Sequence, residues 1–199
     1  MIKICKINEY NPNIIDEIVK IHLATFKGFF LTFLGAGFLH QMYKSYSEFI
    51  DSGILIAKEK ENIVGFLAYS GDLSGLYKYM IKKRLLYFAW YAMGAFIRKP
   101  KVFVRLVRAF LKPKESIRTE KYVELASIGV DPNMKSKGIG SQLVNELKNI
   151  IDFTKYKYIK LETDAKENDA ANHFYVKNGF EFVNMYMTHE GRAMNEYRF

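Results

Sequence analysis

Strand-like runs alternate with helix-like runs along most of the chain, and this order limits the fold more than any other feature. Seven runs have the length and composition of strands, namely 2–7, 53–59, 62–70, 122–130, 156–163, 180–187 and 193–199. Four runs repeat apolar residues at helical spacing, namely 13–27, 35–49, 139–151 and 168–178. Such an order is typical of an α/β fold, in which helices pack on the faces of one sheet. We therefore predict a single domain over 1–199, with an insertion at 73–119.

Cysteine and histidine are too sparse to suggest a disulfide framework or a metal centre. The chain has one cysteine, Cys5, which cannot form an internal disulfide and which we interpret as a core residue in a reducing compartment. The four histidines have no cysteine partners at metal-ligand spacing, so no metal is expected. The N-terminal stretch is too short and too interrupted for a signal peptide. These features together predict a cytoplasmic protein.

The excess positive charge is concentrated in the insertion. The net charge is +9, but the segment Leu76–Lys121 carries thirteen Lys and Arg against two acidic residues, so the remainder is slightly acidic. Within this segment 85–97 is an apolar run bracketed by KKR and RKPK, and it is shorter than the roughly twenty residues that span a bilayer. The run 101–112 has apolar residues on one helix face, and the opposite face carries Lys101, Arg105, Arg108 and Lys112.

Several interpretations of the insertion remain open. It is a helical excursion with solvated cations, an interfacial segment that contacts an anionic membrane through 76–112, or a contact for a polyanionic partner or a second subunit in a dimer. Nucleic acid is not expected, because no recognised nucleic-acid module is visible. The membrane interpretation would make the protein peripheral at the inner membrane surface. We also hypothesise that the insertion overhangs an acceptor cleft and helps to bind an anionic acceptor.

The loop DPNMKSKGIGSQL, residues 131–143, joins a strand to a helix and favours an anion site. The first amides of a helix have no partner within it, and the helix dipole adds positive charge at the same end. Neither the dinucleotide fingerprint nor the nucleotide P-loop fits this spacing. An ordinary strand-to-helix turn is the alternative. The candidate phosphate-binding residues are Lys135, Ser136, Lys137, Gly138, Ile139, Gly140 and Ser141.

Two segments together resemble the GNAT superfamily of acyl-CoA N-acyltransferases. The run VDPNMKSKGIGSQL is similar to its acyl-CoA loop, and NDAANHFYVKNGF is similar to its N-x-x-A-x-x-[FL]-Y-x-x-x-G-F helix. The resemblance covers most of the chain outside the insertion and implies a mixed, mostly antiparallel sheet, with acetyl-CoA as co-substrate and no metal. One departure is Lys135, where the family usually has Gln or Arg, and Lys lacks the planar fork of Arg.

The resemblance also implies site residues for direct acetyl transfer. The strand that ends in Ile128, Gly129 and Val130 would splay from its neighbour and offer backbone groups to the pantetheine arm, with the N–H of Ile128 polarising the thioester carbonyl. Gly129 would permit close approach of a ligand. Asn168 would contact the cofactor, and an N-cap role is compatible with this.

Two residues are candidates for proton transfer. Tyr175 matches the tyrosine that the family often uses to protonate the leaving thiolate, and the neighbouring Phe174 looks more like the core aromatic. Glu124 is a candidate base for the amine, with a surface-facing strand residue as the alternative. The aromatic residues Phe26, Phe29 and Phe30 would shape the acceptor pocket or belong to the core. Cys5 lies in no nucleophile pattern, so a covalent acyl-enzyme is not expected.

We therefore predict an acetyl-CoA-dependent N-acetyltransferase that acts on a primary amine of a small acceptor. An anionic acceptor is the hypothesis, such as an amino sugar on a nucleotide or a lipid carrier. A protein or peptide N-acetyltransferase is an alternative. A second alternative is a weakly catalytic GNAT-like module that binds anionic membrane surfaces.

Overall fold

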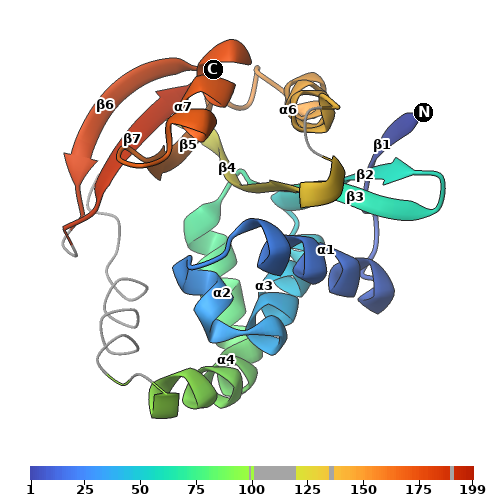
Figure 1. Ribbon diagram of the computed structural model, residues 1–199, viewed down its shortest axis with the longest axis vertical. Coiled ribbons are helices and arrows are strands. Elements are labelled where there is room, and N and C mark those ends of the chain that lie inside the picture. Colours follow the sequence, from blue (N-terminus) through green and yellow to red (C-terminus); the bar gives the residue numbers. More distant parts are fainter. Residues whose placement is uncertain (99, 101–119, 135–136, 189–190) are drawn as a thin grey trace.

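The computed structural model describes residues 1–98, 100, 120–134, 137–188 and 191–199 (Figure 1). Seven strands form one sheet in the order β1-β2-β3-β4-β5-β7-β6. Their bounds are β1 Ile2–Lys6, β2 Ser52–Glu59, β3 Asn62–Ser70, β4 Tyr122–Val130, β5 Tyr158–Asp164, β6 Glu181–Met187 and β7 Ala193–Arg198. Every neighbouring pair is antiparallel except β4 and β5, which are parallel. The predicted mixed, mostly antiparallel sheet is therefore confirmed.

The helices lie between the strands where the sequence predicts them. Their bounds are α1 Pro12–Thr25, α2 Phe30–Leu34, α3 Ala36–Glu48, α4 Leu73–Arg98, α6 Ile139–Ile150 and α7 Asp169–Lys177, with a 3-10 turn at Pro132–Met134. The short α2 was not predicted. At the start of α1, the Asn11 side chain accepts hydrogen bonds from the amides of Asn13 and Ile14 at 3.0 and 3.3 Å. Gly179, just after α7, has a φ of +77°, as the helix end requires.

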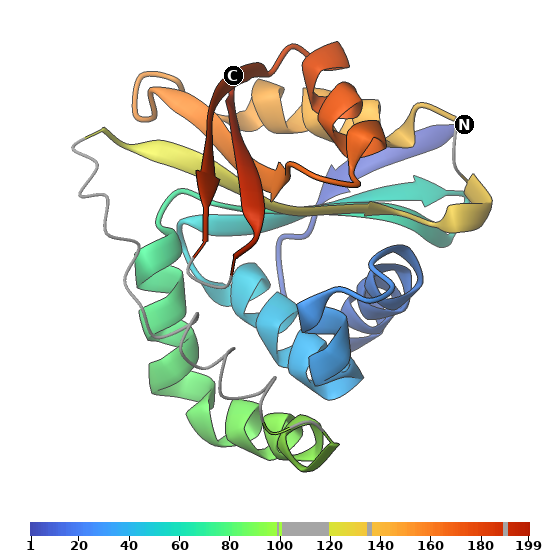
Figure 2. The ribbon, with the colours of Figure 1, turned by 60° about the vertical axis from the view of Figure 1, so that its left-hand side comes forward.

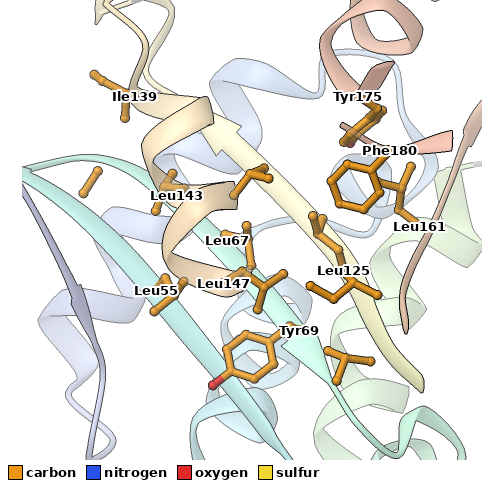
Figure 3. Close-up of a cluster of buried hydrophobic side chains, with 14 of the residues drawn as sticks. Leu55, Leu67, Tyr69, Leu125, Ile139, Leu143, Leu147, Leu161, Tyr175 and Phe180 are labelled. Carbon is orange, nitrogen blue, oxygen red and sulfur yellow. The ribbon is translucent and has the colours of Figure 1, made fainter. Parts of the chain in front are cut away.

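Two helical layers cover the two faces of the sheet (Figures 1 and 2). On one face α6 and α7 pack over a core that includes Leu67, Leu125, Leu143 and Leu147, shown in Figure 3. On the other face α1, α3 and α4 pack over a second cluster, which includes Ile15. Apolar alternation in the strands feeds both layers, because successive side chains point to opposite faces.

The helix α4 is the described part of the insertion between β3 and β4. It packs against α3, and the buried Arg84 joins the two helices through Gln41 at 3.0 Å, Ser45 at 3.1 Å and a close ion pair with Glu48. One cation of the basic segment is thus used in packing. The amphipathic run predicted at 101–112 lies outside the described residues, as does residue 99.

The sheet opens between β4 and β5. Their pairing covers Tyr122 to Glu124 on β4 and ends at the pair Glu124–Lys160. Beyond this point β4 follows β3 to Val130, whereas β5 follows β7 to Asp164. A bulge in the β3–β4 ladder also leaves Ala126 without an opposite residue, and a bulge bends its strand. The divergence creates room between two strands at the centre of the sheet.

Candidate functional site

A cavity of about 330 Å³ lies at this divergence. One wall is the β4 stretch Leu125–Ile128, and another is the β5 stretch Glu162–Asp164. Helices, the segment between α1 and α2, and the start of β7 contribute the rest. The other lining residues are His22, Phe26, Phe29, Leu31, Met42, Tyr46, Tyr77, Tyr175, Arg192 and Met194. Phe26 and Phe29 line this cavity, and Phe26 also packs against the core cluster that includes Ile15, so both expected roles apply to it. The two rings meet edge-on with centroids 5.7 Å apart. The side chain of Phe30 lies outside the description.

The helix start after β4 has the geometry expected of an anion site. Gly138 is the N-cap of α6 with a φ of +70°, and a Cβ at this position would meet nothing within 4 Å. No described side chain caps the helix, so its first amides face the loop. Ile139 is 2 % exposed and anchors the helix in the core. A Cβ on Gly140 would lie 3.1 Å from the Phe174 ring, so this glycine allows α6 and α7 to pack closely.

The other loop residues divide into described and undescribed positions. Lys135 and Ser136 lie outside the described residues. Lys137 is exposed, and its Nζ lies 3.4 Å from the sulfur of Met134 and 3.9 Å from Glu59. Ser141, in the first turn of α6, is half-buried. The loop can therefore bring backbone donors and at least one lysine charge to an anion.

The end of β4 is fixed to α1. The Thr25 hydroxyl donates to the Val130 carbonyl at 3.1 Å, which ties the end of the helix to the strand. A Cβ on Gly129 would lie 2.8 Å from the Phe66 ring. Phe66 is the partner of Gly129 on β3, so glycine makes room for this ring within the sheet. Ile128 is half-buried and lines the cavity, where its backbone borders the opened part of the sheet.

Tyr175 belongs to both the core and the cavity wall. It is 8 % exposed, and its ring contacts Phe174, Phe180 and Tyr197 at centroid distances of 5.3, 5.9 and 6.1 Å. Figure 3 shows Tyr175 and Phe180 side by side in the buried cluster. The expectation that Phe174 is the core residue of the pair is wrong, because Phe174 is only partly buried. Burial raises the pKa of Tyr175 to about 12, so the hydroxyl keeps its proton.

Glu124 is buried in an ion cluster. It is 5 % exposed, so the alternative of a surface-facing residue is wrong. Its Oε2 lies 3.3 Å from Nζ of Lys160, which is 1 % exposed and also forms a close ion pair with Glu162. Glu124 does not line the cavity, whereas Glu162 does. Of the two carboxylates held by Lys160, Glu162 is therefore the one that faces the cavity.

The start of α7 is tied to the β5 wall. Asn168 stands at the N-cap of α7, but its side chain does not cap the helix. Its amide instead donates to the Thr163 hydroxyl at 2.7 Å, and Asn172 donates to the Asp164 carbonyl at 2.9 Å. Arg192 holds the Asp164 carboxylate through two bonds of 2.8 Å. These contacts fix the position of the wall that carries Glu162.

Sequence reasoning missed several residues at the cavity. Glu162 and Asp164 could have been found, because charged and apolar residues alternate in β5 and the charged ones share one face. His22 and Arg192 carry no local signal, since long-range packing alone brings them to the cavity. Among the described residues, no group of three His, Cys, Asp or Glu side chains is arranged to hold a metal ion. No described helix is long and apolar enough to cross a membrane.

The model of the acetyltransferase (GNAT) family matches residues 16–180. The chain belongs to this family. The match includes the loop before α6, the helix α7 and the divergence of β4 and β5. As a GNAT family member, the protein is an acyltransferase enzyme. No curated protein matches the chain.

Solved structures of GNAT proteins share this fold. A protein described as a GNAT-family acetyltransferase from Desulfovibrio desulfuricans has a TM-score of 0.65 and 14% identity, covering 100% of this chain and 98% of that chain. The ribosomal-protein-S18-alanine N-acetyltransferase from Escherichia coli has a TM-score of 0.60 and 14% identity, covering 100% and 92%. Arabidopsis thaliana NAA60, solved in complex with acetyl-CoA, has a TM-score of 0.58 and 14% identity, covering 100% and 98%. At these identities the likeness shows the fold alone.

Proposed function

We propose that this GNAT enzyme transfers an acetyl group from acetyl-CoA directly to a primary amine of a small acceptor held in the cavity. The observation that carries the proposal is the position of the cavity at the β4–β5 divergence, with Tyr175 in its wall. The uncapped start of α6, with Gly138 open above its Cα, fits a pyrophosphate. Bound acetyl-CoA would supply a thioester carbon as the electrophile.

The residues at the cavity then have four tasks. Backbone groups of Ile128, Gly129 and Val130 hold the pantetheine arm, and the N–H of Ile128 polarises the thioester carbonyl. The amine nitrogen forms the new C–N bond, the C–S bond breaks, and the amine loses one proton to a carboxylate. Tyr175 donates a hydrogen bond from its hydroxyl to the departing sulfur, and the thiolate becomes the thiol by taking up one proton, which balances the proton that the amine gave to the carboxylate.

Glu162 is the base that the geometry favours. It lines the cavity, whereas Glu124 does not, and both carboxylates contact Lys160. Glu124 then acts as a positioning residue. It forms an ion pair with Lys160, and this weakens the attraction between Lys160 and Glu162. The comparison of Glu162→Gln with Glu124→Gln tests this assignment. A larger loss of kcat in the Glu124 variant would return the base role to Glu124.

We propose an acceptor molecule that carries an ammonium group at one end and an anionic group at the other. Glu162 suits the ammonium end, and the basic insertion suits a remote anionic group, such as the phosphate of an amino sugar. Glucosamine, glucosamine 6-phosphate and a peptide that begins with alanine would be compared by release of CoA thiol. Higher kcat/KM with the phosphorylated sugar supports the anionic acceptor. Equal efficiency with the two sugars rejects it, and a preference for the peptide favours protein N-acetylation.

Titration calorimetry with coenzyme A tests the enzyme proposal itself. Binding should be present, and Gly138→Ala should weaken it, because the added Cβ projects into the open space above the loop. No binding of coenzyme A, or thiol release that does not depend on an amine, would contradict direct acetyl transfer.

The exposed face of α4 favours a second role at an anionic membrane surface. Large apolar side chains that would be costly to leave in water are exposed there, among them Leu86 at 84 %, Trp90 at 70 % and Ile97 at 75 %. Exposed Lys82 and Lys83 lie on the same helix, so apolar insertion and attraction to anionic lipids would act together.

Vesicle sedimentation with the full chain tests this second role. Leu86→Ser/Trp90→Ser should reduce binding to vesicles rich in phosphatidylserine. Val176→Ser, which changes a residue 55 % exposed on α7, is the matched control and should leave binding intact. Equal binding by all three proteins, or equal binding to neutral vesicles, would reject the membrane role.

A further inference from the structure

A buried histidine lies at the cavity without an assigned role. His22, in α1, is 3 % exposed and lines the cavity. Its ring lies between aromatic neighbours, with centroids 4.6 Å from Phe26 and 5.7 Å from Tyr43. Burial lowers the pKa of His22 to about 4, so the imidazole is neutral near pH 7. A neutral imidazole has one N–H donor and one acceptor nitrogen.

A hydrogen-bonded chain fixes one side of this imidazole. Nδ1 of His22 lies 2.7 Å from the Tyr43 hydroxyl, which lies 3.3 Å from Oγ of Ser127. Tyr43 is fully buried, and burial raises its pKa well above the ordinary value, so it has one hydroxyl hydrogen to donate. Ser127 belongs to the β4 stretch that forms a cavity wall. These two hydrogen bonds therefore connect α1, α3 and β4 beside the opened part of the sheet.

Two orders of donation are possible along these hydrogen bonds, and they place the imidazole hydrogen on different nitrogens. If Ser127 donates to Tyr43 and Tyr43 donates to Nδ1, each hydrogen in the chain is used and only the N–H on Nε2 remains. In the reverse order, His22 donates from Nδ1 and Tyr43 donates to Ser127. This order leaves the Ser127 hydrogen without a partner, so each order has one unused hydrogen. The first order places that hydrogen on Nε2, the buried nitrogen that lacks a partner among the described residues, where a ligand oxygen can accept it.

Nε2 is the atom that could form a hydrogen bond with a ligand. Among the side chains that the structure describes, it is the one buried nitrogen or oxygen without a hydrogen-bond partner. It belongs to a residue of the cavity wall, and its donor hydrogen suits an oxygen. It does not suit the amine nitrogen, because that lone pair must attack the thioester carbon.

We propose that His22 is an acceptor-binding residue whose Nε2–H donates to an oxygen atom of the amine substrate, and that Tyr43 and Ser127 are positioning residues that fix its tautomer. The substrate class is thus an amine that also carries a hydroxyl, ether or carboxylate oxygen. The inference rests on the proposed acetyl transfer and adds a selection rule to it.

Nitrogen NMR of the histidine rings tests the tautomer without any turnover. His22 in the full-length protein should show a protonated Nε2 and an unprotonated Nδ1 near pH 7. Ethanolamine added to the CoA-bound protein should shift the Nε2 resonance, whereas propylamine, with a methyl group in place of the hydroxyl, should not. Tyr43→Phe should change the tautomer ratio. A protonated Nδ1, or a shift caused by coenzyme A alone, would overturn the proposal.

Kinetics with the same two amines test selection. Wild type should prefer ethanolamine, and His22→Ala should lose about three- to tenfold of this preference, which is the ordinary value of one neutral hydrogen bond. His22→Gln keeps an N–H donor near Nε2 and should retain more of the preference than His22→Asn, whose shorter amide lies near Nδ1. For each variant, the ratio of kcat/KM for ethanolamine to kcat/KM for propylamine is compared with that of the wild type. The difference in basicity between the two amines then cancels.

The outcomes separate the two proposals. No coenzyme A binding, or no amine-dependent thiol release, would reject the acetyl-transfer proposal, and the NMR result would still judge the tautomer. Turnover with the same preference in wild type and His22→Ala would reject the role of His22 alone. A Nε2 resonance that does not respond to either amine would also reject it.

Discussion

Replacing Tyr175 by Phe removes one oxygen atom from the cavity wall and leaves the surrounding rings in place. The contacts with Phe174, Phe180 and Tyr197, at 5.3, 5.9 and 6.1 Å, involve the ring and do not need the hydroxyl. The described residues form no hydrogen bond with this hydroxyl. We therefore expect the free energy of unfolding to change by less than about 0.5 kcal/mol, because no buried partner is left unpaired.

The expected effect on catalysis follows from the raised pKa. Burial raises the pKa of Tyr175 to about 12, whereas an ordinary thiol has a pKa of about 8.5. Complete proton transfer from Tyr175 to the free thiolate would therefore be uphill by about 5 kcal/mol. A hydrogen bond that strengthens as charge develops on sulfur is the more favourable contribution. We expect kcat to fall about 100-fold, at the lower end of general acid catalysis, with little change in KM.

Thiol-release kinetics and thermal unfolding of the wild type and Tyr175→Phe provide the assay. The tyrosine stays protonated until the pH approaches 12, so its ionisation should not reduce kcat between pH 7 and 10. A decline in that range that disappears in Tyr175→Phe would refute the reasoning, because the hydroxyl would then titrate far below the value that burial dictates. A variant with wild-type kcat would refute the acid role, and a large loss of stability would reveal a structural one.

Three further predictions concern stability. Gly138→Ala should cost about 1 kcal/mol and lower Tm by about 2–4 °C, because φ is +70°, whereas Gly138→Asn should cost less; equal losses would contradict the backbone argument. The pKa of His22 is lowered in the folded protein, so its contribution to the free energy of unfolding is complete above pH 6.5 and is lost as the pH falls toward 4. Urea unfolding should show about 3 kcal/mol of acid destabilisation that His22→Gln lacks, and identical pH profiles would exclude a buried neutral histidine. Lys160→Met should cost about 3–5 kcal/mol in urea unfolding, because it removes the buried cation from Glu124; a change below about 1 kcal/mol would mean that the pair is not desolvated.

The order of elements could be predicted from the sequence because each element carries its own local pattern. β2 and β3 have apolar runs around a polar turn, and α6 begins where an amphipathic run follows Gly138. The short α2 has five residues and no side-chain cap, so no periodic pattern marks it. Local patterns depend on residues close together in the sequence, so they predict which helices and strands form.

The arrangement of the site could be predicted only in part, because it depends on long-range pairing. Tyr175 could be selected from a motif, but whether it or Phe174 joins the core depends on α6, since Phe174 packs over Gly140. Glu124 could be selected from its apolar strand. Its burial, however, depends on Lys160, which lies 36 residues later in the chain. The bond between His22 and Tyr43 joins two helices whose separate sequences give no indication of it.

The opening of the sheet decides which charged residues of β5 are structural and which can serve chemistry. Lys160, Glu162 and Asp164 share one face of the strand, because side chains two residues apart point the same way. Lys160 lies opposite Glu124 at the last β4–β5 pair, so its charge is compensated within the paired part of the sheet. Glu162 and Asp164 follow after β4 has turned away, and both reach the cavity. Extending the pairing by two pairs of residues would bring Glu162 into the paired part of the sheet. The position of the divergence, rather than the number of carboxylates in the sequence, therefore decides which carboxylates line the cavity.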